Sequence, residues 1–466
     1  MADSTPGVLA GQVRSFLHTL QLDGGLPFSQ LLPAGRIDAV LAELGVTFRD
    51  RVFSPVVTLW AFLSQVVSKD YSCLQAVARV IAYRLGRGRP ACSSGTGSYC
   101  KARGRLPEEL LARLARDSGR QLHRQVPAAW RWKGRRVKLV DGSGVSMPDT
   151  AANQKAYPQP DAQKPGLGFP VARLVVVFCF SCGAVLDAAL GPSKGKKTGE
   201  TALLRGLHDG LEAGDLLLAD RYYCSFFEIA LLRERQVEVV FRQHQRRRVD
   251  FRRGRRLGKD DHVAYWTKPK RPAWLDEATY ARLPGWLAVR EVRLHIRKPG
   301  FRTSVLVLAT TLRDAEAVAA ADLAGLYRAR WHAELDLRSL KHSLHLDVLR
   351  GQTPAMVRKE LWAHLLVYNL LRTVMAEAAA RHELQPRQLS FAAARQTLEA
   401  FEGLLARANA EQGEALLESL LQALARHRVG DRPDRYEPRV RKRRPKQYPL
   451  MTEPREKGRK RMAKMS

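Results

Sequence analysis

Leu216-Leu217-Leu218-Ala219-Asp220 is a short, wholly apolar segment that ends in an acid. A run of this length without polar alternation predicts a strand that is buried on both faces. Patterns typical of helices lie on either side of it, at residues 198–212 and 225–235. A buried strand between two helices is typical of an α/β sheet covered on both faces. This segment therefore predicts an α/β fold.

Four neighbouring segments predict the rest of the sheet. Val137-Lys138-Leu139-Val140-Asp141 is a second strand that ends in an acid, and residues 171–180, 184–190 and 237–241 have the apolar patterns of further strands. The predicted order is three strands, a helix, a strand, a helix and a strand. This order gives five strands of an α/β sheet covered by helices on both faces.

The charge of the chain indicates the kind of partner. The 466 residues include 78 Lys plus Arg against 46 Asp plus Glu, a formal net charge of +32. A surplus this large predicts a polyanionic partner, either nucleic acid or an anionic membrane surface. No run reaches the ~20 apolar residues of a spanning helix, the first residues lack a signal-peptide pattern, and six cysteines in so long a chain make no disulfide framework. We therefore expect a soluble cytoplasmic protein that binds nucleic acid and does not bind a membrane.

Asp141 and Asp220 share one setting, because each follows an apolar strand and precedes turn or polar residues. The carboxyl ends of strands in open α/β sheets face the functional crevice. Two carboxylates placed there repel each other unless a cation lies between them, so the pair indicates a metal site. The alternative is that each aspartate only caps the turn that follows it.

A third acid, Glu334, lies in a helical pattern after residue 321. At about 100° per residue, Tyr327, Arg330, Glu334 and Lys341 fall within about 60° of each other on one face of a continuous helix. The alternative is a solvated face with an ordinary Arg330–Glu334 pair four residues apart.

Together these residues resemble a known family. Tyr327-x2-Arg330-x3-Glu334-x6-Lys341 matches the signature of bacterial DDE transposases of the insertion-sequence-four type. Asp141-Gly142-Ser143 resembles the first aspartate motif of that family, and Asp220-Arg221-Tyr222-Tyr223 resembles the second. Residues 99–107 and 349–354 are also similar to family sequence, so the resemblance spans nearly the whole chain.

The resemblance implies an RNase H-like catalytic core, with a mixed five-stranded sheet flanked by helices. It also implies metal-dependent DNA cleavage at insertion-sequence ends, followed by strand transfer into target DNA. Two Mg²⁺ ions, with Mn²⁺ as a substitute, would be held by the catalytic residues Asp141, Asp220 and Glu334. The resemblance also implies that Tyr327, Arg330 and Lys341 hold the transposon-end backbone. Arg221 is a further candidate phosphate contact, and Trp286 and Trp331 are candidates for stacking on a displaced base, with core packing as the alternative for either.

Changes of pattern and charge along the sequence, together with the resemblance, divide the chain into five parts. We expect an all-α N-terminal DNA-binding domain at 1–128, with a basic loop at 86–104, and an RNase H-like core at 129–241 and 321–352. Residues 242–320 are the expected β-rich insertion, which begins with eight arginines between Arg242 and Arg256. The helices of 353–425 are a candidate dimerisation region. Residues 426–466, with 16 basic and 5 acidic side chains, are predicted to be a disordered basic tail.

The expected partners are double-stranded DNA, as inverted-repeat ends and as target, and a second copy of the chain in the synaptic complex. The expected location is the bacterial cytoplasm, in association with the nucleoid. Two alternatives to an active transposase remain: a catalytically inactive or repurposed relative that binds DNA ends, and another RNase H-like nuclease.

Overall fold

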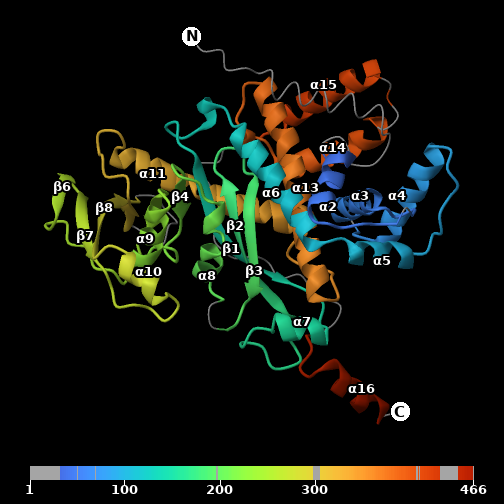
Figure 1. The fold of residues 1–466 in the computed structure, drawn as a ribbon, viewed down its shortest axis with the longest axis horizontal. Coiled ribbons are helices and arrows are strands. Elements are labelled where there is room, and N and C mark those ends of the chain that lie inside the picture. Colours follow the sequence, from blue (N-terminus) through green and yellow to red (C-terminus); the bar gives the residue numbers. More distant parts are fainter. Residues whose placement is uncertain are drawn as a thin grey trace.

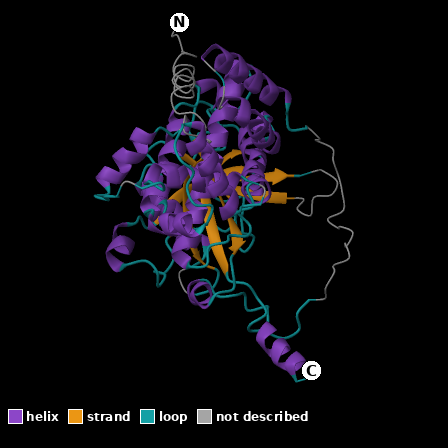
Figure 2. Cartoon of the chain, turned by 90° about the vertical axis from the view of Figure 1, so that its right-hand side faces the viewer, coloured by secondary structure: helices purple, strands orange, loops and turns teal. Residues whose placement is uncertain are grey.

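A computed structural model describes residues 32–49, 51–68, 70–195, 198–296, 305–405, 408, 410–430 and 450–464. The first 31 residues of the predicted N-terminal domain and residues 431–449 of the predicted tail lie outside the described residues. Figure 2 shows the strands in the middle of the molecule with helices packed around them. No helix in the described part is long and apolar enough to cross a membrane.

The predicted five-stranded mixed sheet is present. It consists of β1 (Val137–Ser146), β2 (Val171–Cys179), β3 (Val185–Pro192), β4 (Leu216–Ala219) and β5 (Glu238–Arg242), in the order β3-β2-β1-β4-β5. The first three strands are antiparallel, whereas β1, β4 and β5 run parallel. The α/β fold class is therefore confirmed.

The sheet is larger than the sequence predicts. Four strands of the insertion, β6 (Arg255–Gly258), β7 (Asp261–Thr267), β8 (Trp286–His295) and β9 (Val305–Thr310), continue the same sheet to nine strands in the described residues. β9 pairs antiparallel with β5, with Val240 opposite Thr310. The five-strand count was therefore too small, because pairing with β9 covers the open edge of β5 and such long-range pairing leaves no local pattern. Figure 1 shows β6, β7 and β8 at the side of the sheet opposite helices α2 to α5.

Two layers of helices cover the sheet. Alternate residues of β4 belong to two hydrophobic clusters, Leu216 and Leu218 to one and Leu217 and Ala219 to the other. The first cluster includes α6 (Glu108–Arg124) and α13 (Pro354–Arg381), and the second includes α8 (Glu200–Arg205) and α9 (Phe226–Glu234). α6 approaches β3 closely at Gly119, where a Cβ would lie 1.8 Å from the Val185 carbonyl oxygen. Burial on both faces confirms the prediction made from the β4 segment.

The N-terminal region is helical as predicted, with α2 (Ala34–Glu43), α3 (Pro55–Val67), α4 (Cys73–Gly86) and α5 (Gly97–Arg105) before α6. Ser54 caps α3, since its hydroxyl accepts a hydrogen bond from the Val57 N–H at 3.3 Å. The interpretation of residues 86–104 as a loop was wrong for its second half. α5 forms there because Tyr99 and Ala102 bury one side of it.

Two other predicted helices differ from the prediction. The helix predicted at 198–212 is reduced to α8 and the 3-10 turn η2 (His208–Gly210), because α8 ends at Gly206. The helix carrying Glu334 is divided into α11 (Ala320–Ala329), α12 (Trp331–Arg338) and the π-helical turn η3 (Ser339–Ser343). The remaining short elements are η1 (Ala128–Trp130), α7 (Ala151–Ala156), α10 (Glu277–Arg282) and η4 (Pro386–Gln388).

The C-terminal region continues with α14 (Phe391–Leu405), α15 (Ala410–Arg426) and α16 (Arg455–Ala463). α13 is buried along most of its length and shares a hydrophobic cluster with α3, α6 and α15, so its surface is used within the chain. Dimerisation through this region stays a prediction for α14 and α15. α16 contradicts the disorder predicted for its part of the tail, since Pro454 precedes the helix, Glu456 lies in its first turn and basic residues lie in its last. In Figures 1 and 2 α16 projects away from the rest of the molecule.

Candidate active site

Asp141 lies within β1 and not at its end. The sequence predicts a strand that stops at this aspartate, but β1 continues to Ser146 because β2 pairs with it along the whole length. The parallel neighbour β4 is shorter and pairs with β1 only from Val137 to Leu139. Asp141 therefore occupies the part of β1 that extends past β4.

Asp220 directly follows β4, as the sequence predicts. Leu139 is opposite Leu218, so the same register carried two residues further sets Asp141 opposite Asp220. Each carboxylate also accepts a local backbone hydrogen bond, Asp141 from the Gly142 N–H at 2.9 Å and Asp220 from the Tyr222 N–H at 2.8 Å. The capping role considered as an alternative is thus real, but it engages only one oxygen of each acid.

Glu334 reaches the same place from α12. Arg330 connects the two segments, because its guanidinium lies 2.7 Å from a carboxylate oxygen of Glu334 and 3.3 Å from one of Asp141. Arg330 and Asp141 are mostly buried, with 17% and 18% of their side chains exposed, whereas Glu334 is 39% exposed. The Arg330–Glu334 pair is therefore more than a solvated surface pair.

The acids influence one another electrostatically. Burial raises the pKa of Asp141 to about 6, and the nearby charges of Asp220 and Glu334 add to this rise. The Arg330 guanidinium and the Gly142 N–H act in the opposite direction. The raised pKa of Asp141 therefore results first from its burial and only secondarily from the neighbouring acids.

The signature residues do not lie on one regular helix. Arg330 is the junction between α11 and α12, and Lys341 lies in the π-helical turn η3. Lys341 Nζ donates to the Ser143 hydroxyl at 3.1 Å and to the Gly144 carbonyl at 3.2 Å, next to Asp141. Tyr327 lies under the Arg330 guanidinium, with 5.9 Å between the cation and the ring centre. The four side chains are brought together around β1, although the continuous helix predicted from the spacing was wrong.

Of the other predicted DNA contacts, Arg221 and Trp331 adjoin residues of the site, whereas Trp286 does not. Arg221 follows Asp220 and donates to the Gln245 side chain at 2.7 Å, and Trp331, beside Arg330, is 54% exposed. Trp286 is exposed at the start of β8, where it packs against Tyr265. The pairing of β8, β9 and β5 sets Trp286 toward the amino end of β5, whereas Asp220 lies at the carboxyl end of β4. The structure therefore does not bring Trp286 to the carboxylates.

Glu200, the first residue of α8, is a fourth acid beside this centre that sequence reasoning missed. Its carboxylate lies against Gly142, where a Cβ would be 2.6 Å from the carboxyl carbon, and Tyr223 donates to it at 3.4 Å. Burial raises the pKa of Glu200, and the charge of Asp220 raises it further, while Arg173 and Tyr223 lower it. No signal in the local sequence distinguishes this glutamate from other acids in first helical turns.

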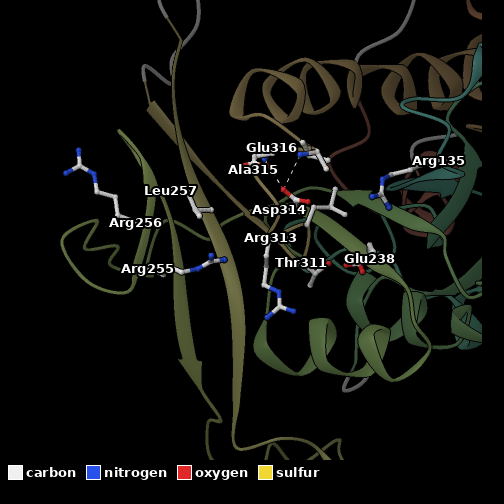
Figure 3. Close-up of a pocket in the computed structure, with 13 residues that line it drawn as sticks. Arg135, Glu238, Arg255, Arg256, Leu257, Thr311, Arg313, Asp314, Ala315 and Glu316 are labelled. Atoms are coloured by element: carbon white, nitrogen blue, oxygen red, sulfur yellow. Dashed lines mark hydrogen bonds between the residues drawn. The ribbon is translucent and has the colours of Figure 1, made fainter.

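A cavity of about 860 Å³ lies elsewhere, between the insertion and the core. Figure 3 shows Arg135, Arg255 and Arg313 around it, together with Glu238 and Asp314. Glu238 begins β5 and Arg135 precedes β1, so the cavity lies at the amino ends of these parallel strands. None of the predicted site residues lines it.

Five strands in the order β3-β2-β1-β4-β5 form a mixed α/β core, with Asp220 directly after β4 and Asp141 in the part of β1 that extends past β4. A sequence model of the transposase DDE domain matches residues 132–370, more than half of the chain, and the chain belongs to this family. The transposase InsG of insertion sequence element IS4 from Escherichia coli K12 is 28% identical over 428 residues, across 89% of this chain and 91% of InsG. The transposase of insertion sequence element IS421 from Escherichia coli is 36% identical over 70 residues, 15% of this chain and 19% of that protein.

A cryo-EM structure of the piggyBac transposase synaptic complex with hairpin DNA covers 83% of this chain, and this chain covers 78% of it. The identity is 10% and the TM-score 0.41, which is too low to define the fold.

Divalent metal ions are the general cofactor of the DDE transposase family. Within the described residues, no three His, Cys, Asp or Glu side chains are grouped to hold a metal ion as they stand. The donors are nevertheless of the right kind, since hard divalent cations bind carboxylate oxygens. The Arg330 guanidinium already stands as a cation between Asp141 and Glu334. The residues present therefore fit a divalent ion in charge and in donor type.

Proposed function

We propose that the protein is a cut-and-paste transposase that cleaves DNA at the ends of its own insertion sequence and transfers them to target DNA. One observation carries this proposal: Arg330 joins Asp141 to Glu334, so that acids from distant parts of the chain meet around a single cation. Membership of the DDE transposase family and the long match to InsG support it.

In this proposal Asp141, Asp220 and Glu334 hold two Mg²⁺ ions, for which Mn²⁺ can substitute. Such ions activate a water or a 3′-hydroxyl and stabilise the leaving oxygen of a phosphodiester. The burial of Asp141 keeps part of this centre away from bulk water, which strengthens electrostatic interactions with a bound phosphate. The Glu334 side chain is more exposed than those of Arg330 and Asp141, with which it is grouped, and remains accessible from solvent.

The basic residues of the site are suited to the DNA backbone. Lys341 Nζ is held by two neutral oxygens, those of Ser143 and Gly144, and a phosphate is a stronger partner for an ammonium than either. Arg330 offers a planar guanidinium that can engage a phosphate with two N–H groups. The Tyr327 ring lies against this guanidinium, with 5.9 Å between the cation and the ring centre. Arg221 extends the same basic surface beyond Asp220.

Trp331, exposed at the start of α12 beside Arg330, is better placed than Trp286 to stack on a displaced base. We propose that two copies of the chain hold the two ends in the synaptic complex, with α14 and α15 as the candidate interface, and that the protein acts on the bacterial nucleoid. The N-terminal helices and the arginines of 242–256 are the proposed backbone contacts outside the site.

The test uses linear DNA that carries the inverted repeats flanking the gene. The parent protein should nick this DNA with Mg²⁺ or Mn²⁺ and not in EDTA. Asp141→Ala should abolish nicking and still bind the ends in a gel-shift assay, because the proposed backbone contacts remain.

Asp209→Ala is the matched control, since the Asp209 side chain is 92% exposed and pairs only with Arg235 among the described residues. It should cleave like the parent. Cleavage by Asp141→Ala at the parental rate would rule out the proposed site, whereas end binding without cleavage by the parent would favour a catalytically inactive relative.

A further inference from the structure

The cavity between the insertion and the core gathers arginines from three distant segments of the chain. Arg135 precedes β1, Arg255 begins β6, and Arg313 follows β9. Figure 3 shows Arg255 and Leu257 on the side of β6 that faces the core, whereas Arg256 points away from it. The charged residues that line the cavity are four arginines and three acids: Arg135, Arg255, Arg256, Arg313, Glu238, Asp314 and Glu316.

Two of these acids already have partners. Glu238 forms an ion pair with Arg233, which does not line the cavity. Asp314 accepts hydrogen bonds from the backbone N–H groups of Glu316 at 2.9 Å and Ala317 at 3.1 Å, drawn as dashed lines in Figure 3. The third acid, Glu316, is exposed. The acids of the cavity therefore do not occupy its arginines.

The arginines themselves are without partners. In the part of the chain that the structure describes, Arg135, Arg255 and Arg313 make no ion pair and no side-chain hydrogen bond. Arg290 of β8, by contrast, is fully buried and pairs with Asp261. Guanidinium groups that face one cavity without an acid favour an anion there. Phosphate is the anion that suits them best, because a guanidinium can donate two parallel N–H groups to it.

The surroundings of the cavity suit a long polyanion. Arg255 and Arg313 are exposed. Arg252 and Arg253, just before β6, are 91% and 88% exposed and share one acid, Asp250. The basic surface thus continues from the cavity along the preceding turn of the insertion. A nucleic acid can contact such a surface through several phosphates at once.

The cavity is separate from the catalytic carboxylates. Glu238, at the cavity, is opposite Leu216 at the amino end of β4, whereas Asp220 follows the carboxyl end of that strand. At about 3.3 Å per residue, the two positions are about 13 Å apart along the strands. A phosphate held in the cavity is therefore not the one that reacts at the carboxylates.

We propose that this cavity is a second DNA-binding site, in which Arg135, Arg255 and Arg313 hold a backbone phosphate away from the reacting bond. The inference rests on the proposed function for the identity of the polyanion. It does not depend on the carboxylates or on a metal ion, so binding can be measured without cleavage. Arg135 and Arg313 lie outside the arginine-rich segment 242–256, and they join that segment to the core.

The test measures the Kd of the full chain for a fluorescent inverted-repeat duplex in EDTA over a range of salt concentrations. Each phosphate contact contributes about 0.9 to the slope of log Kd against log salt. Arg135→Gln and Arg313→Gln should each lower this slope by about that amount and weaken binding by up to about tenfold at about 0.1 M salt. A duplex of unrelated sequence should lose as much, because phosphate contacts carry no sequence information.

Arg282→Gln is the matched control. Arg282 is also an exposed arginine of the insertion, but it pairs with Glu234 and does not line the cavity. Its slope should stay parental. Arg135→Lys, which keeps the charge, should retain most of the parental slope, and urea unfolding of Arg135→Gln and Arg313→Gln should match the parent, since neither side chain has an ion pair to lose.

Cleavage in Mg²⁺ separates this inference from the proposed function. If Arg135→Gln and Arg313→Gln keep the parental slope while the parent cleaves its ends, the inference is overturned and the proposed function stands. If both variants lose slope but the parent cleaves nothing, the cavity binds DNA and the proposed function fails. A loss confined to duplexes that extend past the cleavage point would assign the bound phosphate to flanking DNA, and a loss with shorter duplexes would assign it to the repeat itself.

Discussion

Arg330 donates to the Asp141 carboxylate across 3.3 Å, although 189 positions separate the two residues in the chain. The contact joins the junction of α11 and α12 to the middle of β1. Because the same guanidinium also holds Glu334, it sets the relative position of two acids from distant segments. Arg330 thus neutralises part of the centre when no other cation is bound there.

Arg330→Gln should lower the free energy of unfolding by about 1–3 kcal/mol in EDTA, because it leaves the mostly buried Asp141 carboxylate without its charged partner. Urea unfolding measures this loss. Saturating Mn²⁺ should stabilise Arg330→Gln more than it stabilises the parent, since the ion then supplies the missing positive charge.

Arg395→Gln is the control for this variant. Arg395 also pairs with an acid four residues on, Glu399, and its side chain is 19% exposed, against 17% for Arg330. We expect a change within about 0.5 kcal/mol, since no second acid depends on Arg395 in the described residues. Equal losses in the two variants would mean that Arg330 contributes only an ordinary helix pair.

Asp336 fixes α12 from the inside of the molecule. It is fully buried and accepts hydrogen bonds from Tyr368 at 2.9 Å, from Arg387 at 2.6 Å and from Arg372. Asp336→Asn would leave two buried guanidinium groups without a negative partner. We expect a loss of about 3–5 kcal/mol in urea unfolding. Cleavage should fall with it, because α12 carries Glu334.

Asp209→Asn provides the comparison, because it removes a single exposed ion pair with Arg235 and should cost less than about 1 kcal/mol. A loss of similar size for Asp336→Asn would show that the buried network contributes little to the stability of the fold.

The sequence was sufficient to predict that Asp141 and Asp220 belong to strands of the sheet, but not how the neighbouring strands pair around them. Asp220 follows a segment that is apolar without interruption, and such a strand has few alternatives to the middle of a covered sheet. The extension of β1 beyond Asp141 depends on β2, which pairs with it from 25 or more positions away along the chain, and a local pattern cannot contain that information. The same applies to β9 beside β5.

The break at Arg330 and the position of Glu200 were missed for different reasons. No proline or glycine marks residue 330, so helical spacing alone predicts a continuous helix there. Glu200 is the first residue of a short helix, where the helix dipole alone explains an acid. Its contact with Gly142 exists only once β1 and α8 are placed side by side.

His364 is expected to make stability depend on pH. It is buried in α13, donates from Nδ1 to the Glu360 carbonyl at 2.7 Å, and burial lowers its pKa to about 4. Because the unfolded chain keeps a pKa near 6.5, it binds the proton first, and stability from this group falls as the pH drops from 6.5 to 4. The loss should reach about 2 kcal/mol by pH 5.

His364→Asn keeps an N–H donor and removes the titration. Urea unfolding at pH 7 and pH 5 should show a smaller decrease for the variant than for the parent. His332 has a pKa lowered to about 4 by burial and contributes with the same sign, whereas the raised pKa of Asp141 acts in the opposite direction. Only the difference between variant and parent therefore reports on His364, and equal decreases would contradict the assignment.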